Sequence, residues 1–261
     1  MKIAYMLKTV NSDMTAYHDF KWPKRGKVEA PDWDPAPLCG GGLHGLLDGE
    51  GDGTHLIFDP SAVWLVVKID RDEVVELEGK VKVPQGSVVH CGNQVSATQY
   101  LQKKGLNGAI VGATVTRGAY GIATVGHNGT AVAGHKGTAV AGKHGTALAG
   151  IEGKAVVDAG GTAKVEGFGV AIAGTSGTAV AGDYGQATAD FNGKAIAGKY
   201  GTTDVGEHGI AVVGEYGRLI FDWWARGSGR RQTSVFYVGE DGIKANTPYR
   251  CVDGKAIEVK E

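Results

Sequence analysis

The sequence predicts a mainly β protein: an octapeptide-repeat β-solenoid with an N-terminal α+β domain and a C-terminal β cap. The first observation is a column of alanines spaced eight residues apart, at Ala131, Ala139, Ala147, Ala155, Ala163, Ala171, Ala179, Ala187 and Ala195. A short fixed period over a third of a chain is typical of a solenoid of near-identical turns. The second observation is composition: 44 of 261 residues are glycine, and none of the 7 prolines lies between Pro84 and Pro248. Because proline cannot donate a ladder hydrogen bond, so long a proline-free stretch favours continuous β ladders.

Charge and cysteine content narrow the class of protein. The 27 basic and 28 acidic residues give a formal net charge of −1, which argues against a nucleic-acid scaffold with its basic stripe. Three distant cysteines favour a reducing compartment over a disulfide framework. The start lacks the features of a signal peptide, and no stretch reaches the ~20 apolar residues of a membrane span. We therefore expect neither nucleic acid nor a membrane as a partner.

Residues 1–105 are predicted to form the α+β domain. Alternating segments typical of strands occupy 2–10, 62–69, 73–83 and 87–92. The segment SATQYLQKKG predicts one short helix, with Ser96 as N-cap, Gln99 at the capping-box position and Gly105 as the stop.

Residues 106–224 are predicted to form the solenoid. Each unit, such as GHNGTAVA or GKYGTTDV, is a short strand followed by a G-x-x-G turn. Glycine is the residue that most easily adopts the positive φ expected at such corners. The two alanine columns that begin at Ala131 and Ala133 are expected to face inward. The column between them admits Lys164, Thr188 and Asp204, and an unpaired charge is costly to bury, so this column is expected to face outward.

The small inward side chains favour a flat coil of two units. A triangular coil of three units would enclose more volume than alanine methyl groups fill, and unfilled volume costs about 24 cal/mol per Å³. We therefore expect a two-sheet β-roll with about sixteen residues per coil. The alternative of about twenty-four residues is favoured by the bulkiest outward residues, which recur every third unit at Leu148, Ile172, Ile196 and Ile220.

Residues 225–261 leave the repeat and are predicted to form a β cap. The segment RGSGRRQ is expected to be a hinge or exposed loop, followed by short strands with turns at Asp241-Gly242 and Asp253-Gly254. A solenoid needs an end that stops further strand addition. Phe221, Trp223 and Trp224 are expected to form an apolar plug at the last coil.

Several groups of polar residues are candidate metal or cofactor sites. Cys39, His44, His90 and Cys91 are zinc-type ligands, but their spacing matches no common zinc pattern, and a strand would place the adjacent His90 and Cys91 on opposite faces of its sheet. The repeat histidines lie at two different corner positions and are expected to be solvated, at His127, His135, His144 and His208. The sequence therefore predicts no metal and no cofactor.

The outward Thr/Val face of the repeats is the predicted binding surface. A flat, regular β-branched surface is suited to bind a protein partner, another copy of the chain or ice, although such residues also simply fit a pleated sheet. The candidate binding residues are Thr130, Val132, Val140, Leu148, Ile172, Ile196 and Ile220.

The combination of regions resembles uncharacterised phage and prophage proteins that join a small α+β head to octapeptide repeats. The segments that carry the resemblance are KTVNSDMT, LCGGGLH, KVKVPQGSVVHCG, the G-x-x-G-T-A-V-A units and DGIKANTPYRCVDGKAIEV. The resemblance covers nearly the whole chain and implies a phage or prophage origin. It implies no activity, and Gly45 after His44 departs from the Ala-Cys pair that is usual there.

The leading functional expectation is a non-enzymatic interaction or structural protein whose solenoid is a rigid spacer or docking surface, with a host defence protein as a candidate partner. A virion structural role is one alternative. The other is an enzymatic head that is loosely similar to ADP-ribosyl transferases in its G-G-L-H-G turn, with His44 and a carboxylate from Glu73, Glu76 or Glu78 as candidates. The expected partner is a protein or a second copy of the chain, and the expected location is the host cytoplasm or the virion.

Overall fold

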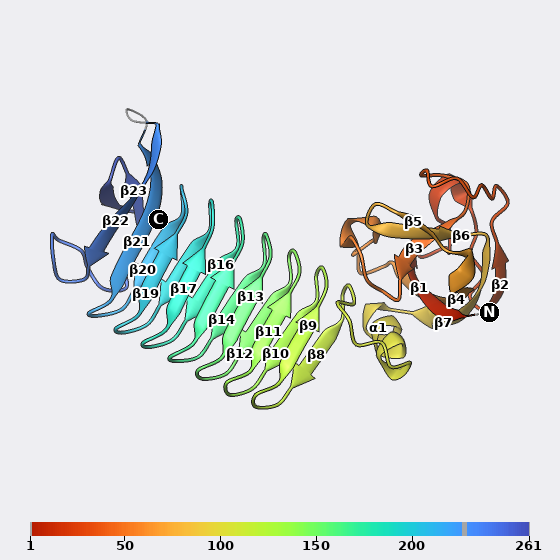
Figure 1. The fold of residues 1–261 in the computed structure, drawn as a ribbon, viewed down its shortest axis with the longest axis horizontal. Coiled ribbons are helices and arrows are strands. Elements are labelled where there is room, and N and C mark those ends of the chain that lie inside the picture. Colours follow the sequence, from red (N-terminus) through yellow and green to blue (C-terminus); the bar gives the residue numbers. More distant parts are fainter. Residues whose placement is uncertain (1, 226–228, 261) are drawn as a thin grey trace. The chain divides into compact units, whose positions relative to one another are not determined.

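A computed structural model of the chain describes residues 2–225 and 229–260 (Figure 1). The chain divides into two compact units, Met1–Ala113 and Thr114–Glu261. The first is a small α+β unit and the second contains a β-solenoid, which confirms the predicted fold class.

The first unit is a seven-stranded antiparallel sheet with the order β2-β7-β4-β1-β3-β6-β5. Its elements are β1 (Ile3–Val10), β2 (Gly26–Glu29), β3 (Leu43–Leu47), β4 (Val63–Asp70), β5 (Val75–Leu77), β6 (Lys80–Val83), β7 (Gln85–Gly92) and α1 (Gln94–Lys103), with 3₁₀ turns at Tyr17–Asp19, Gly53–His55 and Arg71–Glu73.

Strand β4 is buried on both faces of this sheet. Leu65 and Val67 belong to a core cluster with Met6 and Val10. Trp64 points to the other face and is only 2% exposed, because α1 packs against β4 and β7.

Helix α1 begins earlier than predicted. Its N-cap is Asn93, whose Oδ1 accepts a hydrogen bond from the Ser96 amide at 2.9 Å, while the Ser96 hydroxyl accepts one from the Asn93 amide at 3.1 Å. Ser96 is therefore the N3 residue of a capping box and not the N-cap, because Asn93 accepts the Ser96 amide and the helix already includes Gln94 and Val95. The predicted stop is correct, since Gly105 has φ +85°.

The second unit contains two parallel sheets of short repeat strands. The even sheet holds β8 (Thr114–Arg117), β10 (Thr130–Ala133), β12 (Thr146–Ala149), β14 (Thr162–Val165), β16 (Thr178–Ala181), β18 (Lys194–Ala197) and β20 (Ile210–Val213). The odd sheet holds β9 (Ile122–Val125), β11 (Thr138–Ala141), β13 (Lys154–Val157), β15 (Val170–Ala173), β17 (Gln186–Ala189), β19 (Thr202–Val205) and β21 (Arg218–Ala225).

The register confirms sixteen residues per coil. Ala131 pairs with Ala147 in the even sheet, and Ala139 pairs with Ala155 in the odd sheet. Consecutive strands alternate between the sheets, so each coil contributes one strand to each (Figure 1). The twenty-four-residue alternative is wrong: Leu148 and Ile196 lie in the even sheet, whereas Ile172 and Ile220 lie in the odd sheet.

The alanine columns fill the space between the two sheets. Ala131, Ala139 and Ala147 are each 0% exposed, and the second column is also buried. Within each strand from β9 to β20 the first and third residues are more exposed than the second and fourth. The assignment of inward and outward columns is therefore confirmed.

The expected role of the corner glycines is wrong. The residue with positive φ is the second x of each G-x-x-G, as in Asn128 (φ 53°) and His144 (φ 55°), and in most units it is not glycine. The flanking glycines are required for space instead. A Cβ on Gly134 would lie 2.7 Å from the Ala119 nitrogen, because consecutive corners stack backbone on backbone.

Antiparallel strands follow the last repeat strand of each sheet. β22 (Arg230–Tyr237) pairs with β21, and β23 (Tyr249–Val252) pairs with β20 and with β24 (Lys255–Glu258). The buried plug is formed by Leu219 and Phe221, each 1% exposed. The predicted contribution of Trp224 is wrong, because β21 continues past the coil and leaves this side chain 51% exposed. Residues 226–228 of the predicted hinge lie outside the described residues.

Candidate functional site

The even sheet presents the more regular of the two outward surfaces. The first position of its strands carries five successive threonines, Thr114, Thr130, Thr146, Thr162 and Thr178. The third position carries Thr116, Val132, Leu148, Lys164 and Val180 on the same strands. We call these ten outward side chains the threonine face. Beyond it the first position changes to Lys194 and Ile210.

The odd sheet is chemically mixed in the equivalent positions. Its first positions are Ile122, Thr138, Lys154, Val170, Gln186, Thr202 and Arg218. Threonine follows threonine nowhere in this column. The two outward surfaces therefore differ although the repeat unit that builds them is the same.

The structure separates the seven predicted binding residues into two groups. Thr130, Val132, Leu148 and Ile196 lie on the even sheet. Val140, Ile172 and Ile220 lie on the odd sheet. Because the outward residues of the two sheets point away from the shared interior, no single flat partner contacts both groups. Self-association through an outward face stays a prediction, which light scattering would measure.

A stack of aromatic rings follows one corner edge of the solenoid. Phe168, Tyr184, Tyr200 and Tyr216 have consecutive ring centroids 4.9, 4.9 and 5.1 Å apart, with interplanar angles of 1°, 16° and 14°. Lys199 lies over Tyr200 and Tyr216 and pairs with Glu215 at 3.1 Å. This stack was not predicted, although aromatic residues recur every sixteen positions at the second corner residue from Phe168 to Tyr216.

The corner histidines are distributed over both edges. His127 and His144 have ring centroids 5.4 Å apart, whereas His135 contacts Tyr120 and His208 contacts Phe191. Among the described residues, no group of three or more His, Cys, Asp or Glu side chains is arranged to hold a metal ion.

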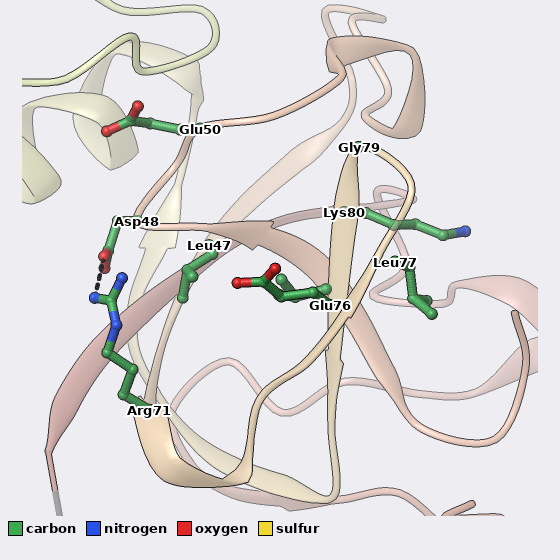
Figure 2. A pocket seen from close by; sticks show the side chains of 9 residues that line it. Leu47, Asp48, Glu50, Arg71, Glu76, Leu77, Gly79 and Lys80 are labelled. Atoms are coloured by element: carbon green, nitrogen blue, oxygen red, sulfur yellow. Dashed lines mark hydrogen bonds and ion pairs between the residues drawn. The ribbon is translucent and has the colours of Figure 1, made fainter. Parts of the chain in front are cut away.

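The first unit has a shallow pocket beside β5 and β6, drawn in Figure 2. Arg71 and Asp48 form an ion pair of 3.0 Å at one side of it, and the Glu76 side chain lies in its middle. The Lys80 side chain points away from that ion pair (Figure 2).

His44 is surrounded by lysines. It lies on β3 opposite Lys82 of β6, and its pKa is lowered by partial burial and by the charges of Lys80, Lys8 and Lys82. Glu76 and Glu78 are exposed, and Glu73 lies 3.4 Å from the Gln85 amide. Each candidate carboxylate thus lies outside the group of charges that act on His44. The geometry does not support the ADP-ribosyl-transferase alternative.

The remaining thiol and imidazole groups of the first unit have separate environments. Cys39 is exposed, with its Sγ 3.3 Å from Lys80 Nζ. His90 contacts the Ser96 hydroxyl at 3.0 Å, and partial burial lowers its pKa. Cys91 packs at the margin of the core cluster.

A search of the described helices for a membrane-crossing segment finds none with the necessary length and apolar character.

Comparison with known proteins gives two separate matches. Residues 4–103 match a family model described as "Domain of unknown function (DUF7666)". The chain is also 37% identical over 97 residues to the ice nucleation protein of Xanthomonas campestris pv. translucens, which is 36% of this chain and 6% of the relative. It is 34% identical over 98 residues to ice nucleation protein InaU of Pantoea ananas, which is 37% of this chain and 10% of the relative. An ice nucleation protein of Pseudomonas syringae is 32% identical over 103 residues, which is 39% of this chain and 9% of the relative. No solved structure matches the chain.

These findings correct the functional expectations. The relatives are bacterial ice nucleation proteins, so the expected phage or prophage origin is unsupported. The expected docking or spacer protein and the virion structural role are overturned by the same matches. The expected location in a host cytoplasm or virion rested on the phage resemblance and is wrong for the same reason. The chain spans at most about a tenth of the curated relatives described above, and the domain that its first unit matches has no known function.

Proposed function

We propose that the solenoid binds ice, or orders water into an ice-like layer, through the threonine face. The observation that carries the proposal is the unbroken, uncharged column of five threonines beside Val132, Leu148 and Val180 on one sheet, in a second column that also holds Thr116 and Lys164. The names of the bacterial relatives support it, with the matched stretch taken to be the repeat array.

The spacing of the column suits water. Adjacent strands lie about 4.7–4.9 Å apart, so successive threonine hydroxyls repeat at that distance. Two waters hydrogen-bonded to a common third at the tetrahedral angle lie about 4.5 Å apart, given an O···O distance of about 2.75 Å. Each hydroxyl donates one hydrogen bond and accepts others. A threonine column can therefore hold a row of waters close to their spacing in ice.

The neighbouring apolar column has a complementary role. Val132, Leu148 and Val180 offer no hydrogen bond, so waters above them must bond to one another and to the threonine-bound row. Because both sheets are continuous backbone ladders over a close-packed interior, the side chains are held in fixed positions. Fixed side-chain positions matter because waters bound to mobile side chains would not keep a regular spacing.

A matched pair of variants tests the proposal. Thr146→Lys places a long cation in the threonine face, and Thr138→Lys places the same side chain at the equivalent strand position on the odd sheet. We expect Thr146→Lys to lose ice binding, measured by ice-affinity partition and by thermal hysteresis. We expect Thr138→Lys to retain both, with equal melting temperatures for the two variants.

Equal ice binding by the two variants contradicts the assignment of the threonine face. Absence of ice partition by the unsubstituted protein contradicts the proposed function itself. Droplet-freezing temperatures measured on the same samples distinguish promotion of freezing from binding to ice that has already formed.

A further inference from the structure

The second unit has a cavity of about 240 Å³ beside the corners that follow β17 and β19, where β21 runs on past the coil. We call it the corner cavity. Its volume is below the roughly 300 to 1,000 Å³ of sites for drug-sized ligands, so it accommodates one compact chemical group. Acidic and aromatic residues line it, at Asp190, Glu207 and Asp222 and at Phe191, Trp223 and Trp224.

The register of the repeats explains why a cavity is present here. Asp190 and Gly206 directly follow β17 and β19, and Asp222 is the equivalent residue of β21, so the three lie side by side in successive coils. Gly206 has no side chain, which leaves a gap between the two aspartates. Because two strand spacings separate them, their backbones lie about 9.6 Å apart.

Hydrogen bonds hold both aspartates in place. Asp190 Oδ1 accepts a hydrogen bond from the Phe191 amide at 2.8 Å. Asp222 Oδ1 accepts one from the Thr233 hydroxyl at 2.6 Å, and Asp222 Oδ2 pairs with Arg231 at 2.9 Å. A calcium ion needs its oxygen ligands within about 2.6 Å, and the part of the chain that the structure describes has no group of three or more His, Cys, Asp or Glu side chains placed to hold a metal.

The corner cavity carries an excess of negative charge. Arg231 balances Asp222, whereas Glu207 approaches only His208, at 3.5 Å. Asp190 forms no ion pair with any described residue. Three carboxylates and one guanidinium line the cavity, so their charges leave a net −2, which favours a cationic ligand.

The aromatic residues of the cavity are exposed although they are large and apolar. Trp224 is 51% exposed and Phe191 is 41% exposed, so neither serves to fill the interior of the solenoid. Trp223 is fixed by a hydrogen bond from its Nε1 to the Ser234 hydroxyl at 3.0 Å. An aromatic face attracts a cation that lies within about 6 Å of the ring centre, and tryptophan does so most strongly.

We propose that the corner cavity binds the quaternary ammonium group of a small organic cation. Trp224 and Phe191 supply aromatic rings, and Asp190 and Glu207 supply the negative charge. A primary ammonium group brings three N–H donors that need acceptors in direct contact, but both oxygens of Asp222 already accept hydrogen bonds from the chain. A quaternary ammonium group has no N–H, so its alkyl groups pack against the rings while its charge is attracted by the surrounding carboxylates.

The test uses the full chain and tetramethylammonium as the probe, added at constant ionic strength. NMR follows the indole N–H signal of Trp223, which a Trp223→Phe variant identifies. Parallel titrations use tert-butanol, which has a similar shape without the charge, and methylammonium, which has the same charge with N–H donors. We expect a saturable shift, with an affinity for tetramethylammonium at least about threefold above that for either control compound.

Each contrary outcome of the titrations overturns the proposal. An equal response to tert-butanol would show a merely apolar cavity. An equal or tighter response to methylammonium would show binding through N–H donors. A Trp223 signal that tetramethylammonium leaves unchanged would show that the cavity takes no such ligand.

Matched variants locate the site. Glu207→Gln removes a charge from the cavity, whereas Glu215→Gln removes one at the same position of the next corner, on the opposite edge, where Glu215 pairs with Lys199. Trp224→Leu removes an aromatic ring and keeps an apolar side chain. We expect Glu207→Gln and Trp224→Leu to weaken tetramethylammonium binding at least about threefold and Glu215→Gln to leave it unchanged. Equal affinity in all three variants overturns the proposal, and two cavity variants keep the test decisive if one of them fails to fold.

Discussion

At the scale of single residues, the inward alanines determine how closely the two sheets approach. Ala147 is 0% exposed and has an identical neighbour in the coils before and after it, Ala131 and Ala163. This inward column holds only alanine from Ala123 to Ala195, and larger side chains enter it only near the ends of the array, at Val115, Thr203 and Leu219. The alanine column is therefore a packing constraint that the middle coils share.

Substitution of one inward alanine tests this constraint. Ala147→Leu should destabilise the solenoid by about 1 to 3 kcal/mol or more, because added methylenes in a packed interior force strain on their neighbours. Val132→Ser on the adjacent strand points outward and serves as control, with an expected change within about 0.5 kcal/mol. Denaturant unfolding of both variants measures the difference, and equal stability would show that the interior is loosely packed.

Lys8 links the stability of the first unit to pH. Its folded pKa of about 8 lies below the ordinary value of 10.5, so between these values the unfolded chain binds more protons than the folded one. Stability should therefore rise as pH increases from about 8 to 10. Burial of the ammonium is the larger cause of the lowered pKa, and the positive charge of Lys80 adds to it.

Comparison of Lys8→Met with the unsubstituted protein isolates the contribution of Lys8 to the pH dependence of stability. At 1.36 kcal/mol per pKa unit, the shift sets an upper limit of about 3 kcal/mol, and partial hydration of the ammonium reduces it. We expect the variant to be more stable at pH 7 and the gain to disappear near pH 10, measured by urea unfolding. A gain that stays constant with pH would contradict the assignment.

At the scale of elements, the corner is where sequence and structure diverge most. The regular glycines predicted a turn, and a turn is present, but the positive φ belongs to residues such as His144 and Tyr184. From the sequence alone, each corner glycine was expected to be required for its own positive φ. Its actual role depends on the coil stacked against it, which no local pattern contains.

Two glycines at equivalent corner positions distinguish a need for backbone freedom from a need for space. A Cβ on Gly134 would meet the Ala119 nitrogen at 2.7 Å and the Gly118 carbonyl carbon at 2.8 Å, whereas a Cβ on Gly118 meets no atom within 4 Å. Neither residue has a positive φ. Gly134→Ala should therefore lower the melting temperature, and Gly118→Ala should not, as measured by calorimetry. Equal losses would mean that backbone freedom, and not space, is what the corners require.

The helix and the plug show the same dependence on context. Ser96 and Asn93 both belong to residue types that cap helices, and the capping box uses both, so composition alone could not assign the first turn. Trp224 resembled Phe221 as an apolar residue after the last unit. The eight-residue length of β21 and its pairing with β22 decide that only Phe221 is buried.

At the scale of the whole molecule, the period of the sequence predicted the solenoid and its interior correctly. The proposed binding surface could not be predicted from the same period. Consecutive eight-residue units lie in different sheets, so each outward residue can be assigned to a sheet only when the number of units per coil is known. The five threonines in the first column of the threonine face occur at every second unit, at Thr114, Thr130, Thr146, Thr162 and Thr178. In an eight-residue alignment they are mixed with Lys154, Gln186 and other odd-sheet residues.

The length of the array offers a direct test of how the face works. Seven even-sheet strands at about 4.8 Å span about 30 Å, and residues 130–161 make two complete coils. In-register duplication of these residues should preserve folding, since each coil contacts only its neighbours. It should also increase thermal hysteresis. Duplication that raises neither hysteresis nor ice partition would contradict a cooperative face.

The antiparallel strands β22 and β23 have an evolutionary consequence. They occupy the hydrogen-bonding edges that a further parallel coil would need, so the array is sealed at this end and can lengthen only by duplication within it. The units near the beginning, GHNGTAVA and GHKGTAVA, are nearly identical, whereas GKYGTTDV near the seal has diverged. Recombination between near-identical neighbours is most frequent where they match best. Descendants of this protein are thus expected to vary in coil number mainly around residues 126–149.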